Sequence, residues 1–254
     1  MNCFSRFSTI DSFRRLAWNK TSPKQLERAE RRIFESVHSE FEGRYVPILN
    51  RTQKIWTRVS NVTSRNTPLV LLHGFGGGVA LWSLNLDRLC ADRPIYAIDL
   101  PGFARSSRPV FSLDHHEAEK EIVDMIEQWR IGIGLNEPFI LLGHSFGGFL
   151  SASYALRYPT HIKQLVLIDP WGLGRKPENI WDTGRLQRVP TCLRSFSSVM
   201  MKLSPLAGLR AAGPLGESVN HCRFERTKAS SCLIRRSCDQ ILPIGSSCQV
   251  RKTL

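Results

Sequence analysis

The sequence predicts an α/β protein built on a doubly wound, mostly parallel sheet. Short, continuously apolar runs, typical of strands buried on both faces, alternate four times with longer amphipathic segments typical of crossover helices. Glycine-rich loops follow two of these runs, and in such a sheet the ligand-binding loops gather at the carboxyl ends of the strands. With 254 residues, 42% of them hydrophobic and 22% charged, the chain has a globular composition and can bury one sizeable core.

The N-terminal segment, residues 1–21, is a basic leader in which Arg and Lys alternate with aromatic and aliphatic residues. Three interpretations stay open: a helix lying on an anionic lipid surface, a mitochondrial transit peptide, and a disordered leader. Residues 22–41 follow with apolar residues at helical spacing, and Ser22 precedes Pro23 at the expected start. They predict an amphipathic helix capped by Ser22.

The predicted core spans residues 22–170. Its strands are expected at residues 45–49 and 54–60, as an opening antiparallel pair, and at Leu69–Leu72, Ile95–Leu100, Phe139–His144 and Gln164–Asp169, as buried parallel strands. Helices are expected over residues 80–91, 114–131 and 146–158. His115 and His116 open the second of these helices, on its solvated side, and we expect them to be exposed rather than catalytic.

The central motif is G-x-S-x-G, formed by Gly143, Ser145 and Gly147 at the end of the third buried strand. A turn from strand directly into helix brings the two backbones so close that both glycines are needed, and it pushes the serine hydroxyl above the sheet. Ser145 is therefore the candidate nucleophile. The N–H of Phe146 begins the following helix and is a candidate oxyanion donor.

The other glycine loop is His73-Gly74-Phe75-Gly76-Gly77-Gly78, directly after Leu69–Leu72. Gly74 and Gly76 allow the backbone to approach a ligand, so the Phe75 N–H is the second candidate oxyanion donor. A phosphate-binding loop is the alternative. It is disfavoured because no Lys-Ser or Lys-Thr follows the glycines and the G-x-G-x-x-G spacing fails.

These motifs together resemble the α/β-hydrolase superfamily, and the match is closer than that level. The runs T-P-L-V-L-L-H-G-F-G-G-G from Thr67, R-S-S-R-P from Arg105, D-P-W-G from Asp169 and P-L-A-G-L-R from Pro205 look like the abhydrolase-domain 4/5 branch. The resemblance implies a serine hydrolase or acyltransferase without a cofactor, acting on acyl esters of glycerophospholipids or lysophospholipids and on N-acyl phospholipids. It also implies an alternative, a non-catalytic co-activator of a triglyceride lipase, and a lid over residues 171–216.

Three local departures from that branch matter. Ser145 stands where the vertebrate co-activator has Asn, so the nucleophile is retained here. Ala104 stands where the family usually has Gly, and we expect a displaced loop there. The family's lipid-binding N-terminus is rich in tryptophan, whereas this leader has only Trp18.

The histidine that would act as general base and the carboxylic acid that would orient it are not identified. Downstream of Ser145 the sequence holds only His161, expected at the far edge of the sheet, and His221, which follows no strand pattern. Completing the sheet takes about 55 residues, but the tail from Glu217 to Leu254 has 38 and no resemblance to the family. We expect a truncated splice form or a gene-model frameshift, the alternative being a new C-terminal module. Catalysis should be impaired.

The net charge and the cysteines limit which classes of partner are expected. The net charge of +13 suits an anionic partner or a solubilising surface, and because no basic run or aromatic-interleaved RNA-binding motif appears, a lipid surface is favoured over nucleic acid. The seven cysteines form no C-x-x-C pair, so no metal site is expected and reduced thiols in the cytoplasm are the default. The expected location is peripheral, on a lipid droplet or membrane.

Overall fold

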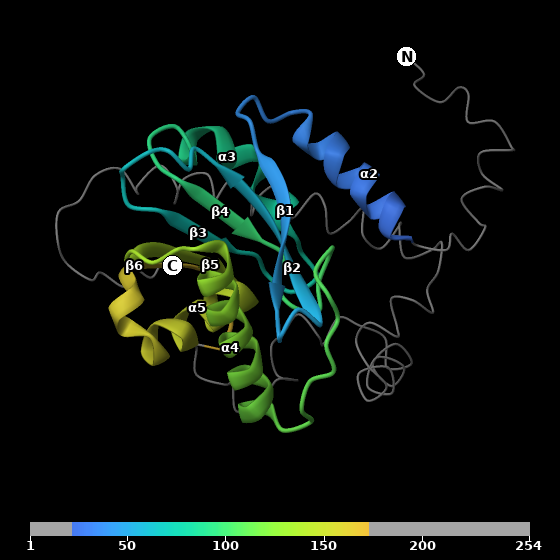
Figure 1. The fold of residues 1–254 in the computed structure, drawn as a ribbon, viewed down its shortest axis with the longest axis vertical. Coiled ribbons are helices and arrows are strands. Elements are labelled where there is room, and N and C mark those ends of the chain that lie inside the picture. Colours follow the sequence, from blue (N-terminus) through green and yellow to red (C-terminus); the bar gives the residue numbers. More distant parts are fainter. Residues whose placement is uncertain (1–21, 173–254) are drawn as a thin grey trace, which may run out of the picture. The chain divides into compact units, whose positions relative to one another are not determined.

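The computed structural model describes residues 22–172. The leader, residues 1–21, the tail, residues 217–254, and all of the expected lid except Trp171 and Gly172 lie outside the described residues. The described elements, in chain order, are α2 (Pro23–Phe34), β1 (Glu42–Ile48), β2 (Gln53–Ser60), β3 (Leu69–Leu72), η1 (Val79–Trp82), α3 (Ser83–Leu89), β4 (Ile95–Ile98), α4 (His115–Ile133), β5 (Phe139–His144), α5 (Phe146–Arg157), η2 (Pro159–His161) and β6 (Ile162–Ile168) (Figure 1).

The strands form one sheet in the order β1-β2-β4-β3-β5-β6. β1, β2 and β4 pair antiparallel, whereas β4, β3, β5 and β6 run parallel to one another. The parallel half confirms the predicted doubly wound sheet. Because parallel strands end at the same edge, the loops that follow β3, β4, β5 and β6 all lie at one edge of the sheet.

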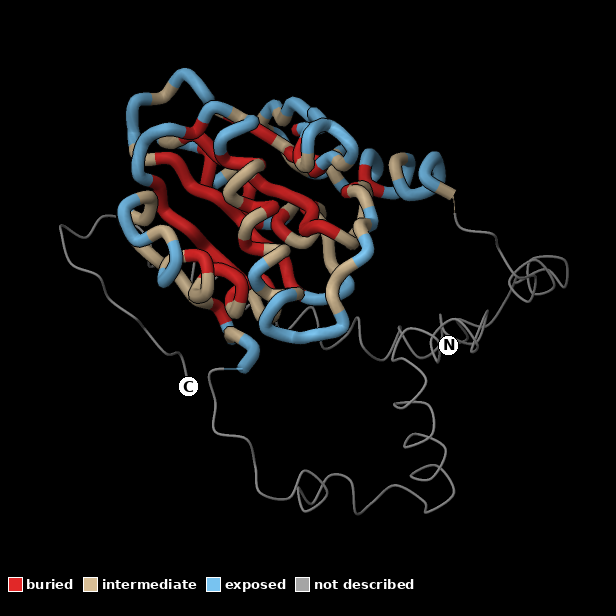
Figure 2. Tube along the Cα trace, turned by 60° about the horizontal axis from the view of Figure 1, so that its bottom comes forward, coloured by how far each residue is buried: buried red, intermediate tan, exposed pale blue. Residues whose placement is uncertain are grey.

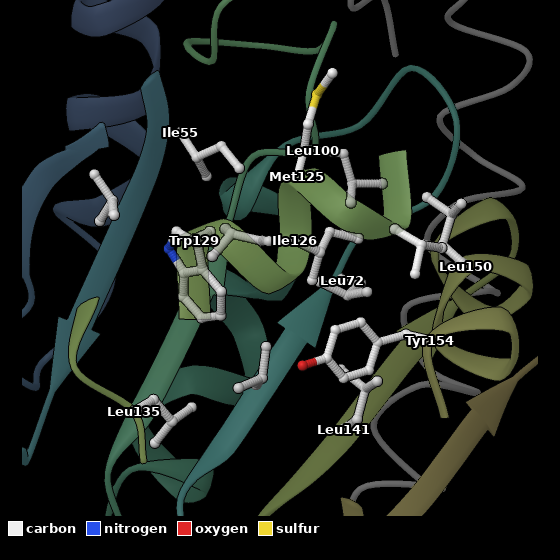
Figure 3. Close-up of a cluster of buried hydrophobic side chains, with 14 of the residues drawn as sticks. Ile55, Leu72, Leu100, Met125, Ile126, Trp129, Leu135, Leu141, Leu150 and Tyr154 are labelled. Atoms are coloured by element: carbon white, nitrogen blue, oxygen red, sulfur yellow. The ribbon is translucent and has the colours of Figure 1, made fainter. Parts of the chain in front are cut away.

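Two apolar clusters cover the two faces of the sheet. One packs α4 and α5 against the sheet through Trp129, Leu141 and Tyr154 (Figure 3), and the other packs η1 and α3 through Trp82 and Leu86. All four residues of β3 are completely buried, as expected for a strand with helices on both faces. Figure 2 shows the buried strands in the interior and exposed residues mainly on the helices and loops.

The expected helix over residues 22–41 is wrong at its C-terminal end, because α2 ends at Phe34. The Ser36 hydroxyl donates to the Ile33 carbonyl at 2.7 Å and closes the last turn. The Asp87 carboxylate then accepts hydrogen bonds from the backbone N–H groups of His38 and Ser39 at 3.1 and 2.7 Å. A carboxylate 48 residues away in the chain therefore holds this segment as a loop.

Four other boundaries also differ from the prediction. β1 begins at Glu42, three residues before the expected start, and stops before Leu49 and Asn50, whose positive φ angles of 48° and 52° turn the chain. The expected helix over residues 80–91 is divided into η1 and α3. β4 ends at Ile98 instead of residue 100, and β6 covers Ile162–Ile168 instead of 164–169.

Glu30 is the buried residue of α2, although it is charged and its apolar neighbours Leu26 and Ile33 are exposed. Its carboxylate accepts from the Trp56 indole N–H at 3.1 Å and from the Arg58 guanidinium at 2.8 Å. Arg105 adds a contact at 3.4 Å and stacks its guanidinium 3.5 Å from the Trp56 ring centroid. These charged contacts join α2 to β2 and to the loop after β4.

Ala104 has a φ of 41°, in the left-handed region that favours glycine. The alanine therefore keeps the left-handed backbone conformation that a glycine would adopt here, and it does so at the cost of backbone strain. Its Cβ lies 3.0 Å from the position that a Cβ on Gly78 would occupy, so the loop also packs closely against the first glycine loop.

We expect Glu30→Ala to lower the free energy of unfolding by about 3 kcal/mol, because removing one partner of a buried ion pair leaves the other charge buried and unpaired. Urea unfolding followed by circular dichroism measures the change. Glu35→Ala, an exposed glutamate at the end of the same helix, is the matched control. A loss below about 1 kcal/mol would show that water solvates Arg58 and Arg105 in the variant.

We expect Ala104→Gly to raise the free energy of unfolding by about 0.5 to 1 kcal/mol. Relief of the left-handed strain, about 1 to 2 kcal/mol, outweighs the extra entropy that glycine gives the unfolded chain. Ala118→Gly, inside α4, should instead destabilise by about 1 kcal/mol. Equal destabilisation by both substitutions would contradict the strain at residue 104.

Candidate active site

Ser145 lies at the turn between β5 and α5, with φ 54° and ψ −114°, in a backbone conformation that L-residues rarely adopt. A Cβ on Gly143 would collide with the Gly147 carbonyl and the Ser151 hydroxyl, and a Cβ on Gly147 would collide with the carbonyls of Leu72 and His73. Both glycines are thus required by the approach of strand and helix. The expected sharp strand-to-helix turn is present.

The end of β6 and the segment that follows it hold this turn in place. The Ser145 N–H donates to the Ile168 carbonyl at 3.0 Å, and the Trp171 N–H donates to the Ser145 carbonyl at 2.9 Å. Asp169, between them, has a φ of 45°. The last residue of β6 and the D-P-W-G run therefore together fix the Ser145 backbone, a role that sequence reasoning did not assign to them.

The first glycine loop lies directly beside Ser145, because a Cβ added to Gly74 would lie 3.1 Å from the Ser145 Cβ. The Gly77 N–H donates to the Gly74 carbonyl at 3.0 Å, and Gly76 has a φ of 72°, so a tight turn follows Phe75. No hydrogen bond within residues 22–172 engages the Phe75 N–H, and that of Phe146 belongs to the first turn of α5, where helical N–H groups have no partner within the helix. Both N–H groups are thus available to a ligand.

His73 and Asp99 fix this loop from inside, and sequence reasoning missed both. His73 accepts a hydrogen bond from the Leu100 N–H at its Nε2 (2.9 Å), so its proton sits on Nδ1, which donates to the Gly74 carbonyl at 2.8 Å. Burial lowers the pKa of His73 to about 4, so the ring stays neutral. Their only sequence signal is their position directly after β3 and β4.

The Asp99 carboxylate joins the two loops at the site. It accepts from the Val79 N–H at 2.7 Å and from the Arg105 N–H at 2.9 Å. Burial raises the pKa of this carboxyl to about 7, against the opposing effect of these hydrogen bonds. The completely buried Asp99 is therefore a brace between backbone segments.

Aromatic rings from three loops and from α5 gather around Phe146, the residue after Ser145. Phe146 lies 6.4 Å from Phe75, 6.1 Å from Phe103 and 5.9 Å from Trp171, between ring centroids. Phe149 completes the group at 6.3 Å from Phe146. Phe75 and Trp171 are 58% and 64% exposed, so this group of five residues, which we call the aromatic wall, is accessible next to the candidate nucleophile.

Residues 22–172 supply no histidine that hydrogen-bonds to Ser145. His161 lies at the other end of α5, about 18 Å away for a 12-residue helix, and its Nε2 pairs with Glu127 at 3.5 Å. His144 has a buried, unpartnered Nδ1, and burial lowers its pKa. His115 and His116 are exposed, as expected, with ring centroids 4.1 Å apart. His221 lies outside the described residues.

Within the described residues, no group of three or more His, Cys, Asp or Glu side chains is arranged to hold a metal ion. In the same part of the chain, no helix combines the length and the apolar character needed to cross a membrane. The described residues are nearly neutral, with 17 Lys and Arg against 16 Asp and Glu, whereas the whole chain has 35 against 22. The basic excess therefore resides in residues 1–21 and 173–254.

The chain is similar to proteins of a known family. The family model for the alpha/beta hydrolase fold matches residues 67–206. The human 1-acylglycerol-3-phosphate O-acyltransferase ABHD5 is 46% identical over 200 residues, and the mouse (lyso)-N-acylphosphatidylethanolamine lipase is 47% identical over 197 residues. These matches cover 78% and 77% of this chain and 56% of each relative, so the chain spans about half the length of the curated relatives it matches.

A solved structure also matches. The crystal structure of a membrane phospholipase A, a bacterial virulence factor, is 28% identical, with a TM-score of 0.51, over 64% of this chain and 49% of that chain. The strand order, the turn at Ser145 and these matches agree, and the resemblance to the abhydrolase-domain 4/5 branch is confirmed by the two curated relatives. The chain belongs to the α/β-hydrolase fold family.

Proposed function

We propose that this chain binds acyl esters of glycerophospholipids or lysophospholipids, and N-acyl phospholipids, at Ser145. Its chemistry is that of a serine hydrolase or acyltransferase of lipid homeostasis, with impaired turnover. The observation that carries the proposal is Ser145 itself, strained at a strand-to-helix turn beside five aromatic rings. The names of the relatives, a lysophosphatidate acyltransferase and an N-acyl phospholipid lipase, support the substrate class.

The roles of the backbone groups follow from general chemistry. The Ser145 hydroxyl attacks the acyl carbonyl, while the N–H groups of Phe75 and Phe146 stabilise the oxyanion of the tetrahedral intermediate. The attack needs a base that removes the hydroxyl proton, and residues 22–172 offer none. The aromatic wall, in contrast, suits the hydrocarbon part of the acyl group.

A second function is favoured by one observation: residues 22–172 hold no base in contact with Ser145. A core that holds an acyl lipid without turning it over can act as a non-catalytic co-activator of a triglyceride lipase on a lipid droplet or membrane in the cytoplasm. Ser145 then contributes to binding rather than to catalysis. Measuring turnover and binding separately distinguishes the two functions.

We expect fatty-acid release from a lysophospholipid to be weak and to change less than about twofold in Ser145→Ala, because a serine without a base gains little nucleophilicity. Fluorophosphonate labelling of the full chain should likewise be faint. The measurement compares both proteins in one assay. Robust turnover that disappears in Ser145→Ala would contradict the impairment and would mean that a residue outside 22–172 supplies the base.

We expect Phe75→Ala and Trp171→Ala each to weaken binding of a long-chain lysophospholipid about tenfold, because each exposed ring loses its contact with the acyl chain. Binding of a short-chain analogue should change little. Displacement of a fluorescent fatty acid measures both affinities. Leu156→Ala, at the opposite end of α5 and 85% exposed, is the control and should change neither. Equal losses for long and short chains would contradict an acyl-chain role for the wall.

A further inference from the structure

The loop between β4 and α4 presents the two most exposed large apolar side chains in the part of the chain that the structure describes. Val110 is 96% exposed and Leu113 is completely exposed. Between them, Phe111 turns inward and packs on Gly102, beside Phe103 of the aromatic wall. We call residues 106–113 the apical loop. The half-buried Phe111 anchors the loop, and the two tips on either side of it expose hydrophobic surface that internal packing does not explain.

The apical loop lies at the active-site edge of the sheet. It connects the carboxyl end of β4 to the amino end of α4. These two ends lie at the edge of the sheet where β3, β4, β5 and β6 end. Phe103, at the start of this connection, contacts Phe75 at 5.4 Å between ring centroids. Val110 and Leu113 therefore belong to the same edge as Phe75 and Trp171, which are the exposed rings beside Ser145.

The charges around the apical loop are basic. Arg108 is exposed, and its guanidinium donates to the carbonyls of Ala104 and Ser106 without a carboxylate partner among residues 22–172. Lys54 is held next to the loop, because its backbone N–H donates to the Ser107 hydroxyl and its carbonyl accepts from the Ser107 N–H, both at 3.0 Å. The Lys54 ammonium lies 4.1 Å from the Tyr45 ring centroid.

The acidic residues nearby are either engaged or displaced from the tips. Asp114 caps α4 by accepting from the N–H groups of His116 and Glu117, both at 3.0 Å. Glu121 accepts from the Ser112 N–H at 3.1 Å. Residues 100–113 themselves contain two arginines and no acidic residue.

We propose that the apical loop is a docking element for an anionic phospholipid surface. Val110 and Leu113 insert below the headgroups, while Arg108 and Lys54 remain at the level of the lipid phosphates. Apolar side chains flanked by positively charged side chains favour this arrangement at a membrane surface. Docking at this edge presents the aromatic wall and Ser145 to the lipid. The proposal extends the proposed function but requires no catalysis, so it also holds for a chain that only binds lipid.

The test measures amide hydrogen exchange of the full chain by mass spectrometry, with phosphatidylcholine vesicles and with vesicles that also contain phosphatidylserine. Exchange of residues 106–113 should slow on the anionic vesicles and much less on phosphatidylcholine alone. In Val110→Ser/Leu113→Ser this local protection should disappear, and vesicle affinity should fall about tenfold. The local readout distinguishes the apical loop from the basic segments outside residues 22–172.

The matched control is Ile131→Ser/Leu156→Ser, which removes two exposed apolar residues (60% and 85%) from the opposite edge. It should keep wild-type protection and affinity. Unchanged exchange of residues 106–113 on every vesicle would overturn the proposal and leave a protein as the class of partner for these tips. Ester turnover without loop protection would overturn only this proposal, whereas protection without turnover or binding of acyl ligands would overturn only the proposed function.

Discussion

The near-contact of β5 with α5 is the constraint on which the rest of the structure depends. It excludes any side chain at Gly143, while the carbonyls at the end of β3 exclude one at Gly147, and it holds Ser145 at a φ of 54°. A strain of this kind persists only when the surroundings enforce it. Here β3 lies against Gly147, and two hydrogen bonds from the end of β6 fix the Ser145 backbone, so three parallel strands jointly maintain one residue.

Two buried polar side chains fix the backbone of the neighbouring loops in the same way. His73 reaches from the end of β3 to Leu100, and Asp99 reaches from the end of β4 to Val79 and Arg105. Each uses a buried polar side chain to satisfy backbone N–H groups that would otherwise be buried without a partner. The glycine loop next to Ser145 is therefore held in place by hydrogen bonds that join it and Val79 to the segment after β4.

The sequence predicts the parallel strands well because their signal is local: Leu69–Leu72 and the apolar residues of Phe139–His144 leave little other than a buried strand. The G-x-S-x-G turn is likewise predictable, since glycines on both sides of a serine indicate that the backbone leaves no room for a Cβ there. The end of α2 could not be predicted, because it depends on Asp87, which is distant in the chain. The burial of Glu30 depends in the same way on Arg58 and Arg105, and helical periodicity alone points to the wrong face.

The topology separates the molecule into two edges with different tolerance to change. All the loops near Ser145 follow strands, whereas the turns that precede β3, β4, β5 and β6 lie at the opposite edge. There, α4 ends in the left-handed Gly134, and exposed residues 136–138 lead into β5. A fluorescent reporter or an epitope inserted in that turn would stand on the far side of the sheet from the aromatic wall, leaving the lipid-facing edge open for measurements on intact membranes.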